Sequence, residues 1–162
     1  MELDKEVIQR IGKLLDRKTV ATAESVTAGQ LQFMLSQIEN AAVNFKGGIT
    51  AYTLEEKVNL LGIDEDEARA SDCVSSQITE DMALQASHLF NADFGIGVTG
   101  YATPVEESHF KLYAYFAISY NMQIIVSEKI ELNKSFLGAK AQQKYGENIL
   151  VAFESILAKL FE

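Results

Sequence analysis

The sequence has little of what metal sites, disulfides and membrane spans require. Its 162 residues include one cysteine, Cys73, and two histidines, His88 and His109. One cysteine excludes an internal disulfide and is compatible with a reducing cytoplasm. The three residues are too widely spaced for a metal-ligand motif, and no apolar run approaches the roughly 20 residues that cross a bilayer. We therefore expect no metal site and no membrane partner.

Basic residues are outnumbered by acidic ones. The chain has 14 Lys and Arg against 23 Asp and Glu, a formal net charge of −9. Nucleic-acid backbones and anionic membranes repel such a chain, so we expect neither as a partner. Residues 1–6 lack the basic-then-apolar pattern of a signal peptide, which together with the cysteine content predicts a cytoplasmic location. The length suits a single domain over residues 1–162.

The patterns that are present alternate between helix and strand. Apolar residues at helical spacing predict an amino-terminal helix around Val7–Leu15 and a long carboxy-terminal helix with an apolar face from Tyr145 to Leu160. Between them the patterns predict strands over 19–22, 45–52 and 94–98, helices over 53–62 and 76–91, and a hairpin over 109–120 and 122–132 that turns near Asn121. This order predicts an α/β fold, a single three-layer α/β/α domain with a mixed sheet of about five strands.

The most informative segment is Ala-Glu-Ser-Val-Thr-Ala-Gly at residues 23–29, between a strand pattern and a helical pattern. At such a turn, unpaired backbone N–H groups and the positive end of the helix dipole converge. A hydroxyl placed there can act as a nucleophile on a carbonyl, or the turn can bind an anion. The same position also suits an ordinary helix cap by Ser25 or Thr27, and Thr27 with Gln30 fits a capping box.

A second segment carries two more candidate residues. Tyr52 leaves the end of the strand over 45–52, and Lys57 lies in the first turns of the helix that follows. Because ligands gather outside the carboxyl ends of strands in α/β sheets, Ser25, Tyr52 and Lys57 come together if the two strands are neighbours. A serine activated by a lysine, with a tyrosine as donor or relay, can hydrolyse an amide. Taken singly, Lys57 is ordinarily a solvated helix lysine and Tyr52 a strand-end aromatic.

Four spaced motifs, in one order, resemble the CinA carboxy-terminal domain family. They are A-E-S-x-T-x-G at 23–29, G-G-x-x-A-Y-x-x-E-x-K-x-x-L-L-G at 47–62, V-S-x-x-x-x-x-x-M-A at 74–83 and D-x-G-I-G-V-T-G at 93–100. This family of competence/damage-inducible proteins includes the nicotinamide-nucleotide amidases, which convert nicotinamide mononucleotide to nicotinate mononucleotide and ammonia in pyridine nucleotide salvage. The resemblance implies a hydrolase that binds a small pyridine nucleotide, needs no cofactor and forms a homo-oligomer, a dimer or higher.

The resemblance also gives roles to individual residues. Ser25 Oγ is expected to attack the carboxamide carbon, neutral Lys57 to accept the serine proton, and Tyr52 to shuttle the proton to the leaving ammonia. Backbone N–H groups around Thr27, Ala28 and Gly29 are expected to hold the oxyanion, with Thr27 Oγ1 as an extra donor. Further substrate-binding residues are expected at the ends of later elements: Thr99, Gly100, Tyr101 and Lys140.

The chain departs from the family pattern around these positions. The usual Ser-Cys-Thr-Gly-Gly is Ser-Val-Thr-Ala-Gly, and Leu54 replaces an asparagine. A Pro- and Gly-rich loop is replaced by residues 101–110, where Glu106 and Glu107 would repel a phosphate. Lys140 stands where the family has an arginine, so it keeps the charge but loses the bidentate fork.

Two interpretations follow from these departures. In one, the chain is a divergent amidase with altered specificity. In the other, it is a catalytically impaired relative that acts as a nucleotide-binding or oligomerisation module, with a homodimer formed through its carboxy-terminal strands and helix. Tyr101 replaces a family proline at the mouth of the site, where it either stacks on a substrate ring or plugs the pocket.

Overall fold

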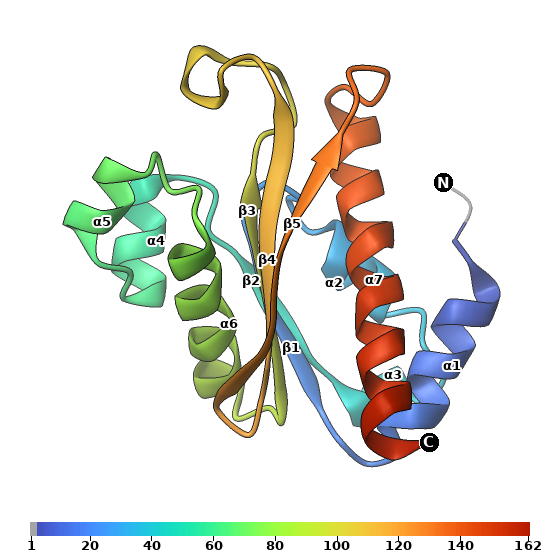
Figure 1. Cartoon of the computed structure of the whole chain (residues 1–162). Helices are drawn as coiled ribbons and strands as arrows, with labels where there is room; N and C mark the ends of the chain where they lie inside the picture. Colours follow the sequence, from blue (N-terminus) through green and yellow to red (C-terminus); the bar gives the residue numbers. More distant parts are fainter. Residues whose placement is uncertain (1–2) are drawn as a thin grey trace.

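A five-stranded mixed sheet forms the centre of the protein (Figure 1). The computed structural model describes residues 3–162, so the first two residues of the amino-terminal segment 1–6 lie outside the described part. The strands lie in the order β2-β1-β3-β4-β5. β1 pairs in parallel with β2 and β3, whereas β4 pairs antiparallel with β3 and β5. The strands are β1 Val20–Glu24, β2 Phe45–Thr50, β3 Phe94–Gly100, β4 Leu112–Tyr120 and β5 Gln123–Leu132.

Helices cover both faces of this sheet, which confirms the expected three-layer α/β/α domain (Figure 1). One face carries α1, α2, α3 and α7, and the other carries α4, α5 and α6. The helices of the described residues are α1 Lys5–Leu15, α2 Gln30–Leu35, α3 Ala41–Asn44, α4 Leu54–Leu61, α5 Glu65–Ala70, α6 Ser76–Phe90 and α7 Ala139–Phe161. Within the described part of the chain, no helix is both long and apolar enough to cross a membrane.

Alternating side chains of the central strands divide the core into two parts. Phe94, Ile96 and Val98 of β3 pack with α1, α2 and α7. On the opposite face of β3, Gly95 and Gly97 lie directly under α6, where an added Cβ would meet the carbonyl oxygens of α6. The absence of these two side chains lets α6 lie close to the sheet. That close packing places the start of α6, and the loop before it, at the carboxyl end of β3.

The hairpin of β4 and β5 turns where the sequence predicts. Tyr120 pairs with Gln123, which leaves a two-residue loop of Asn121 and Met122. Their φ angles of 49° and 62° are those of a type I′ turn, the form that suits the twist of a hairpin. β4 begins at Leu112 rather than at residue 109, because a 3₁₀ turn, Glu106–Ser108, precedes it.

Other boundaries also differ from the expected ones. The short helix α3 lies in what read as a connecting segment, and the helix after the Ser25 turn is only six residues long. The run of acidic residues after Gly62 begins a helix, as its sequence predicts, and this helix is α5. β2 ends at Thr50, two residues before Tyr52. The predicted end of α4 is confirmed, since Gly62 adopts the left-handed conformation there with φ 63°.

Candidate functional site

The turn after β1 is held by Glu24, the last residue of that strand. Its fully buried carboxylate accepts hydrogen bonds from Thr27 Oγ1 at 2.6 Å and from the backbone N–H groups of Leu31 and Gln32 at 3.0 and 2.9 Å. The carboxylate thus accepts hydrogen bonds from the first turn of α2, and its negative charge complements the positive end of the helix dipole. Neither Ser25 nor Thr27 caps this helix, so the cap interpretation and the Thr27–Gln30 capping box are wrong.

This arrangement also changes the expected donors for an oxyanion. The hydroxyl hydrogen of Thr27 is donated to Glu24, so the prediction of Thr27 Oγ1 as an extra donor is wrong. The N–H of Ala28 donates to Ser25 O at 3.0 Å within the turn. Ala28 and Gly29 both adopt positive φ angles, 50° and 97°, and Ala28 does so without the freedom of glycine.

Ser25 and Lys57 meet at one backbone oxygen. Ser25 Oγ donates to Tyr52 O at 3.4 Å, and Lys57 Nζ donates to the same oxygen at 3.0 Å. The two residues come from the β1–α2 turn and from α4, which the parallel pairing of β1 and β2 brings side by side. The predicted convergence of Ser25, Tyr52 and Lys57 is therefore present. Tyr52 contributes its carbonyl, while its side chain is 61% exposed.

Lys57 is buried, unlike an ordinary lysine on a helix surface. Only 2% of it is exposed, and its ammonium form loses hydration in this position. Burial lowers the pKa of Lys57 below its ordinary value, and the nearby Cys73 and Asp72 only partly oppose that effect. A lowered pKa favours the neutral amine, which can accept a proton from a hydroxyl. The interpretation of Lys57 as a solvated lysine is wrong.

A pocket of about 400 Å³ opens over these groups at the carboxyl ends of β1 and β3. Its lining residues come from the loops beside α4, α5 and α6 and from the start of α7, elements that lie toward the upper end of the sheet in Figure 1. Its lining includes six residues that the sequence analysis proposed, namely Ser25, Tyr52, Lys57, Thr99, Gly100 and Tyr101.

Four proposed residues lie outside that lining. Thr27 is fully buried beneath the turn, and Ala28 and Gly29 continue the turn toward α2. Lys140 is exposed in the first turn of α7 and lines a separate, smaller hollow with Phe136 and Glu147. The structure thus brings Ser25, Tyr52 and Lys57 together with the end of β3. It does not bring Lys140 into the pocket.

The family model of the CinA C-terminal domain matches residues 2–147. The chain belongs to the CinA C-terminal domain family. A Streptococcus agalactiae protein named as competence-damage inducible is 38% identical over 128 residues, which are 79% of this chain and 29% of that longer protein. A CinA-like protein of Flavobacterium psychrophilum is 38% identical over 96 residues, 58% of this chain and 23% of its own. The chain therefore spans less than a third of these curated relatives.

Solved structures of this superfamily share the fold. Competence damage-inducible protein A of Klebsiella pneumoniae superposes with a TM-score of 0.88 at 23% identity, over 97% of this chain and 98% of that one. The competence/damage-inducible protein CihA of Agrobacterium tumefaciens superposes with a TM-score of 0.73 at 23% identity, covering 99% of this chain and 97% of that one. At these identities the likeness establishes the architecture alone.

Nine lining residues of this CinA-family chain were not predicted as site residues, and three of them make contacts that bear on the site. Asp72 and Cys73 lie in the α5–α6 loop, and Gln142 lies in α7, where its side chain donates to Val26 O at 3.0 Å. Asp72 accepts a hydrogen bond from the Tyr101 hydroxyl at 3.0 Å. Burial raises the pKa of the Cys73 thiol, and the nearby Lys57 partly opposes this rise.

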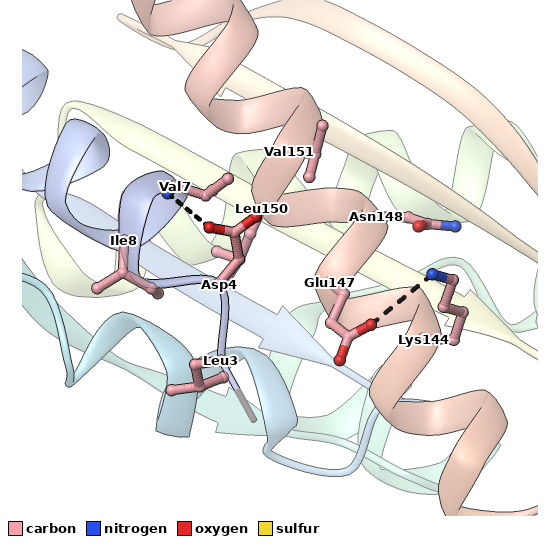
Figure 2. Close-up of a pocket in the computed structure, with 9 residues that line it drawn as sticks. All are labelled: Leu3, Asp4, Val7, Ile8, Lys144, Glu147, Asn148, Leu150 and Val151. Carbon is pink, nitrogen blue, oxygen red and sulfur yellow. Dashed lines mark hydrogen bonds and ion pairs between the residues drawn. The ribbon is translucent and has the colours of Figure 1, made fainter. Parts of the chain in front are cut away.

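A second hollow, of about 460 Å³, lies between α1 and α7 (Figure 2). The charged side chains that line it already have partners. Asp4 accepts a hydrogen bond from the Val7 N–H at 3.2 Å, and Glu147 lies 3.9 Å from Lys144. Its remaining lining is largely apolar and belongs to the packing of the two helices. The smaller pocket, over Ser25, is the one that brings together the predicted nucleophile Ser25 and the predicted base Lys57.

Proposed function

We propose that this chain is a serine amidohydrolase of the nicotinamide-nucleotide amidase type, with nicotinamide mononucleotide as its reference substrate. The observation that supports this most directly is the meeting of Ser25 Oγ and the buried Lys57 Nζ at one carbonyl oxygen inside a pocket. Membership of the CinA C-terminal domain family agrees with it.

In the proposed reaction, Ser25 Oγ attacks the carboxamide carbon while Lys57 accepts the hydroxyl proton. The tetrahedral intermediate then collapses, the C–N bond breaks, and Lys57 returns that proton so that ammonia leaves. Water attacks the resulting ester, Lys57 takes a proton from it, and serine is restored as the acid is released. The Ala28 N–H is already engaged within the turn. The oxyanion role of the Thr27 and Gly29 N–H groups stays a prediction, because neither residue lines the pocket.

Tyr52 has a limited part in this proposal. Its carbonyl oxygen orients both reacting groups, because each donates to it in the resting protein. The relay role of its hydroxyl remains a prediction, since the side chain is mostly exposed at the pocket rim.

A second candidate function is a nucleotide-binding or oligomerisation module without turnover. Leu54, which lines the pocket where the family has an asparagine amide, favours this alternative. Exposed Val151 and Leu160 on α7 offer apolar surface for a homodimer. A module of this kind keeps its affinity for a nucleotide when Ser25 is replaced, whereas an enzyme loses turnover.

The deciding experiment is ammonia release from nicotinamide mononucleotide by the wild-type protein and by Ser25→Ala. We expect the substitution to lower kcat by about 1,000-fold or more, since it removes the nucleophile. Ser155→Ala, at an exposed position of α7, is the matched control and is expected to leave the rate unchanged. Circular dichroism checks that both variants fold. Equal rates for wild type and Ser25→Ala would contradict the mechanism.

A further inference from the structure

The mouth of the pocket is bridged by Asp72 and Tyr101. The Tyr101 hydroxyl donates to Asp72 Oδ2 at 3.0 Å, although the two residues come from different elements. Asp72 belongs to the α5–α6 loop, and Tyr101 follows β3. Both residues line the pocket that contains Ser25. The hydrogen bond therefore sets an aromatic ring and a carboxylate side by side where a substrate enters.

The fold holds both members of this pair in place. Asp72 and Cys73 adopt positive φ angles of 53° and 59°, a conformation that L-residues rarely adopt and that surrounding contacts must maintain. Thr99 Oγ1, buried at the end of β3, donates to Cys73 O at 2.9 Å and fixes the loop. The hydroxyl of Tyr145, a buried residue of α7, donates to Tyr101 O at 2.8 Å.

The pair makes the mouth negative. Burial, followed by the hydrogen bond to Asp72 and the charges of Asp72 and Glu107, raises the pKa of Tyr101 above its ordinary value. The tyrosine therefore stays a neutral donor to Asp72 Oδ2, and the carboxylate of Asp72, which lines the pocket, has a second acceptor oxygen. Lys57, the basic side chain in the described lining, is buried, and burial lowers its pKa below the ordinary value.

We propose that Asp72 and Tyr101 determine specificity and select a cationic carboxamide without a phosphate, an N-ribosylated nicotinamide, over its 5′-phosphate. This inference rests on the proposed amidase function and narrows its substrate class. The pyridinium ring of an N-ribosylated nicotinamide carries a positive charge, which a carboxylate and an aromatic face attract. A phosphate adds almost two negative charges near neutral pH, which Asp72 and Glu107 repel.

The test compares kcat/KM for nicotinamide riboside and nicotinamide mononucleotide at low salt. We expect the wild-type protein to favour the riboside by about tenfold, and Asp72→Asn to lower that ratio by about fivefold. Asparagine still accepts the Tyr101 hydrogen bond, so the variant removes charge but keeps shape. Asp66→Asn, on exposed α5, changes the net charge equally and should leave the ratio unchanged. Added salt should reduce the preference in wild type and not in Asp72→Asn.

The ratio of two substrates also separates specificity from an effect on the base. Asp72 opposes the lowering of the Lys57 pKa, so Asp72→Asn lowers that pKa further and changes both rates together. Such a change cancels in the ratio. Only a direct effect of the carboxylate on the substrate charge alters it.

Two results with an active enzyme would overturn the inference while leaving the amidase proposal intact. One is a wild-type protein that prefers the mononucleotide, especially if Lys140→Ala removes that preference and so places the phosphate at the start of α7. The other is a ratio that Asp72→Asn does not change.

If neither amide is hydrolysed, the amidase proposal fails, and calorimetric binding to Ser25→Ala decides specificity separately. Tighter binding of the riboside then supports the Asp72–Tyr101 assignment, and tighter binding of the mononucleotide contradicts it.

Discussion

Replacing Lys57 by methionine should stabilise the protein while it removes the proposed base. Methionine has a similar length and keeps the apolar stem packed, but it has no amine to bury. Lys57 is 2% exposed, and the described contacts give its amine one hydrogen bond, to Tyr52 O at 3.0 Å. Burying an amine whose hydrogen bonds are incomplete destabilises the folded state by about 1–3 kcal/mol, and one hydrogen bond offsets about 1 kcal/mol of this. We expect Lys57→Met to raise the free energy of unfolding by about 1–2 kcal/mol at pH 7.

The pH dependence of this gain follows from the direction of the pKa shift. In the folded protein the pKa of Lys57 lies below the ordinary value of 10.5 that applies to the unfolded chain. Between these two values the unfolded chain binds more protons, so the stability of the wild-type protein rises with pH. The contribution of Lys57 is most unfavourable below its folded pKa and disappears as pH approaches the unfolded value. The difference between Lys57→Met and wild type should therefore shrink as pH rises.

Urea unfolding followed by circular dichroism, at pH values from about 6 to 10, measures both quantities. Other titrating groups are common to the two proteins, so they cancel in the difference between them. Lys13→Met, at an exposed position of α1, removes the same charge and should change stability by less than about 0.5 kcal/mol at every pH. The reasoning would be refuted if Lys57→Met were less stable than wild type at pH 7, or if the difference did not depend on pH.

Two further predictions concern the Ser25 turn and the hairpin. Glu24→Gln should lower the free energy of unfolding by about 2–3 kcal/mol in urea titrations, because an amide nitrogen then faces a backbone N–H of α2. It should also lower kcat more than it changes KM in the ammonia assay, since the turn positions the nucleophile; a variant as stable and active as wild type contradicts this. Met122→Gly should raise stability by about 1 kcal/mol, since Asn-Gly suits the type I′ turn and glycine adopts φ 62° without strain. A fall in Tm would contradict that prediction.

The fold and the location of the site could be predicted because local patterns determine them. Alternating strand and helix patterns are enough to indicate layers, and residues that follow parallel strands must meet at one edge of the sheet. That geometry brings Ser25 beside α4 whatever the details of packing. Asn121 marks the hairpin for a similar reason, since few residues tolerate a positive φ.

The electrostatics of the site could not be predicted, because they depend on contacts between distant segments. Lys57 belongs to a helix whose sequence is compatible with an exposed lysine, but it is buried, close enough to Asp72 and Cys73 of the α5–α6 loop for them to affect its pKa. Asp72 reaches the pocket lining because it and Cys73 both adopt the left-handed conformation. No turn motif in the sequence predicts this conformation for two consecutive non-glycine residues. Glu24 was overlooked because the hydroxyls after it match the cap pattern better than a strand-end carboxylate does.

The separation of Glu24 from Lys57 has a chemical consequence. Both are buried ionisable residues beside the same turn, and an ion pair between them would stabilise the ammonium form and remove the base. Instead the carboxylate of Glu24 is occupied by Thr27 and by two N–H groups of α2, while Lys57 donates to the carbonyl of Tyr52. A carbonyl oxygen carries only a partial charge, so it orients the amine without holding its proton. The fold thus satisfies the buried carboxylate locally and keeps it from pairing with Lys57, as the proposed proton transfer from Ser25 to Lys57 requires.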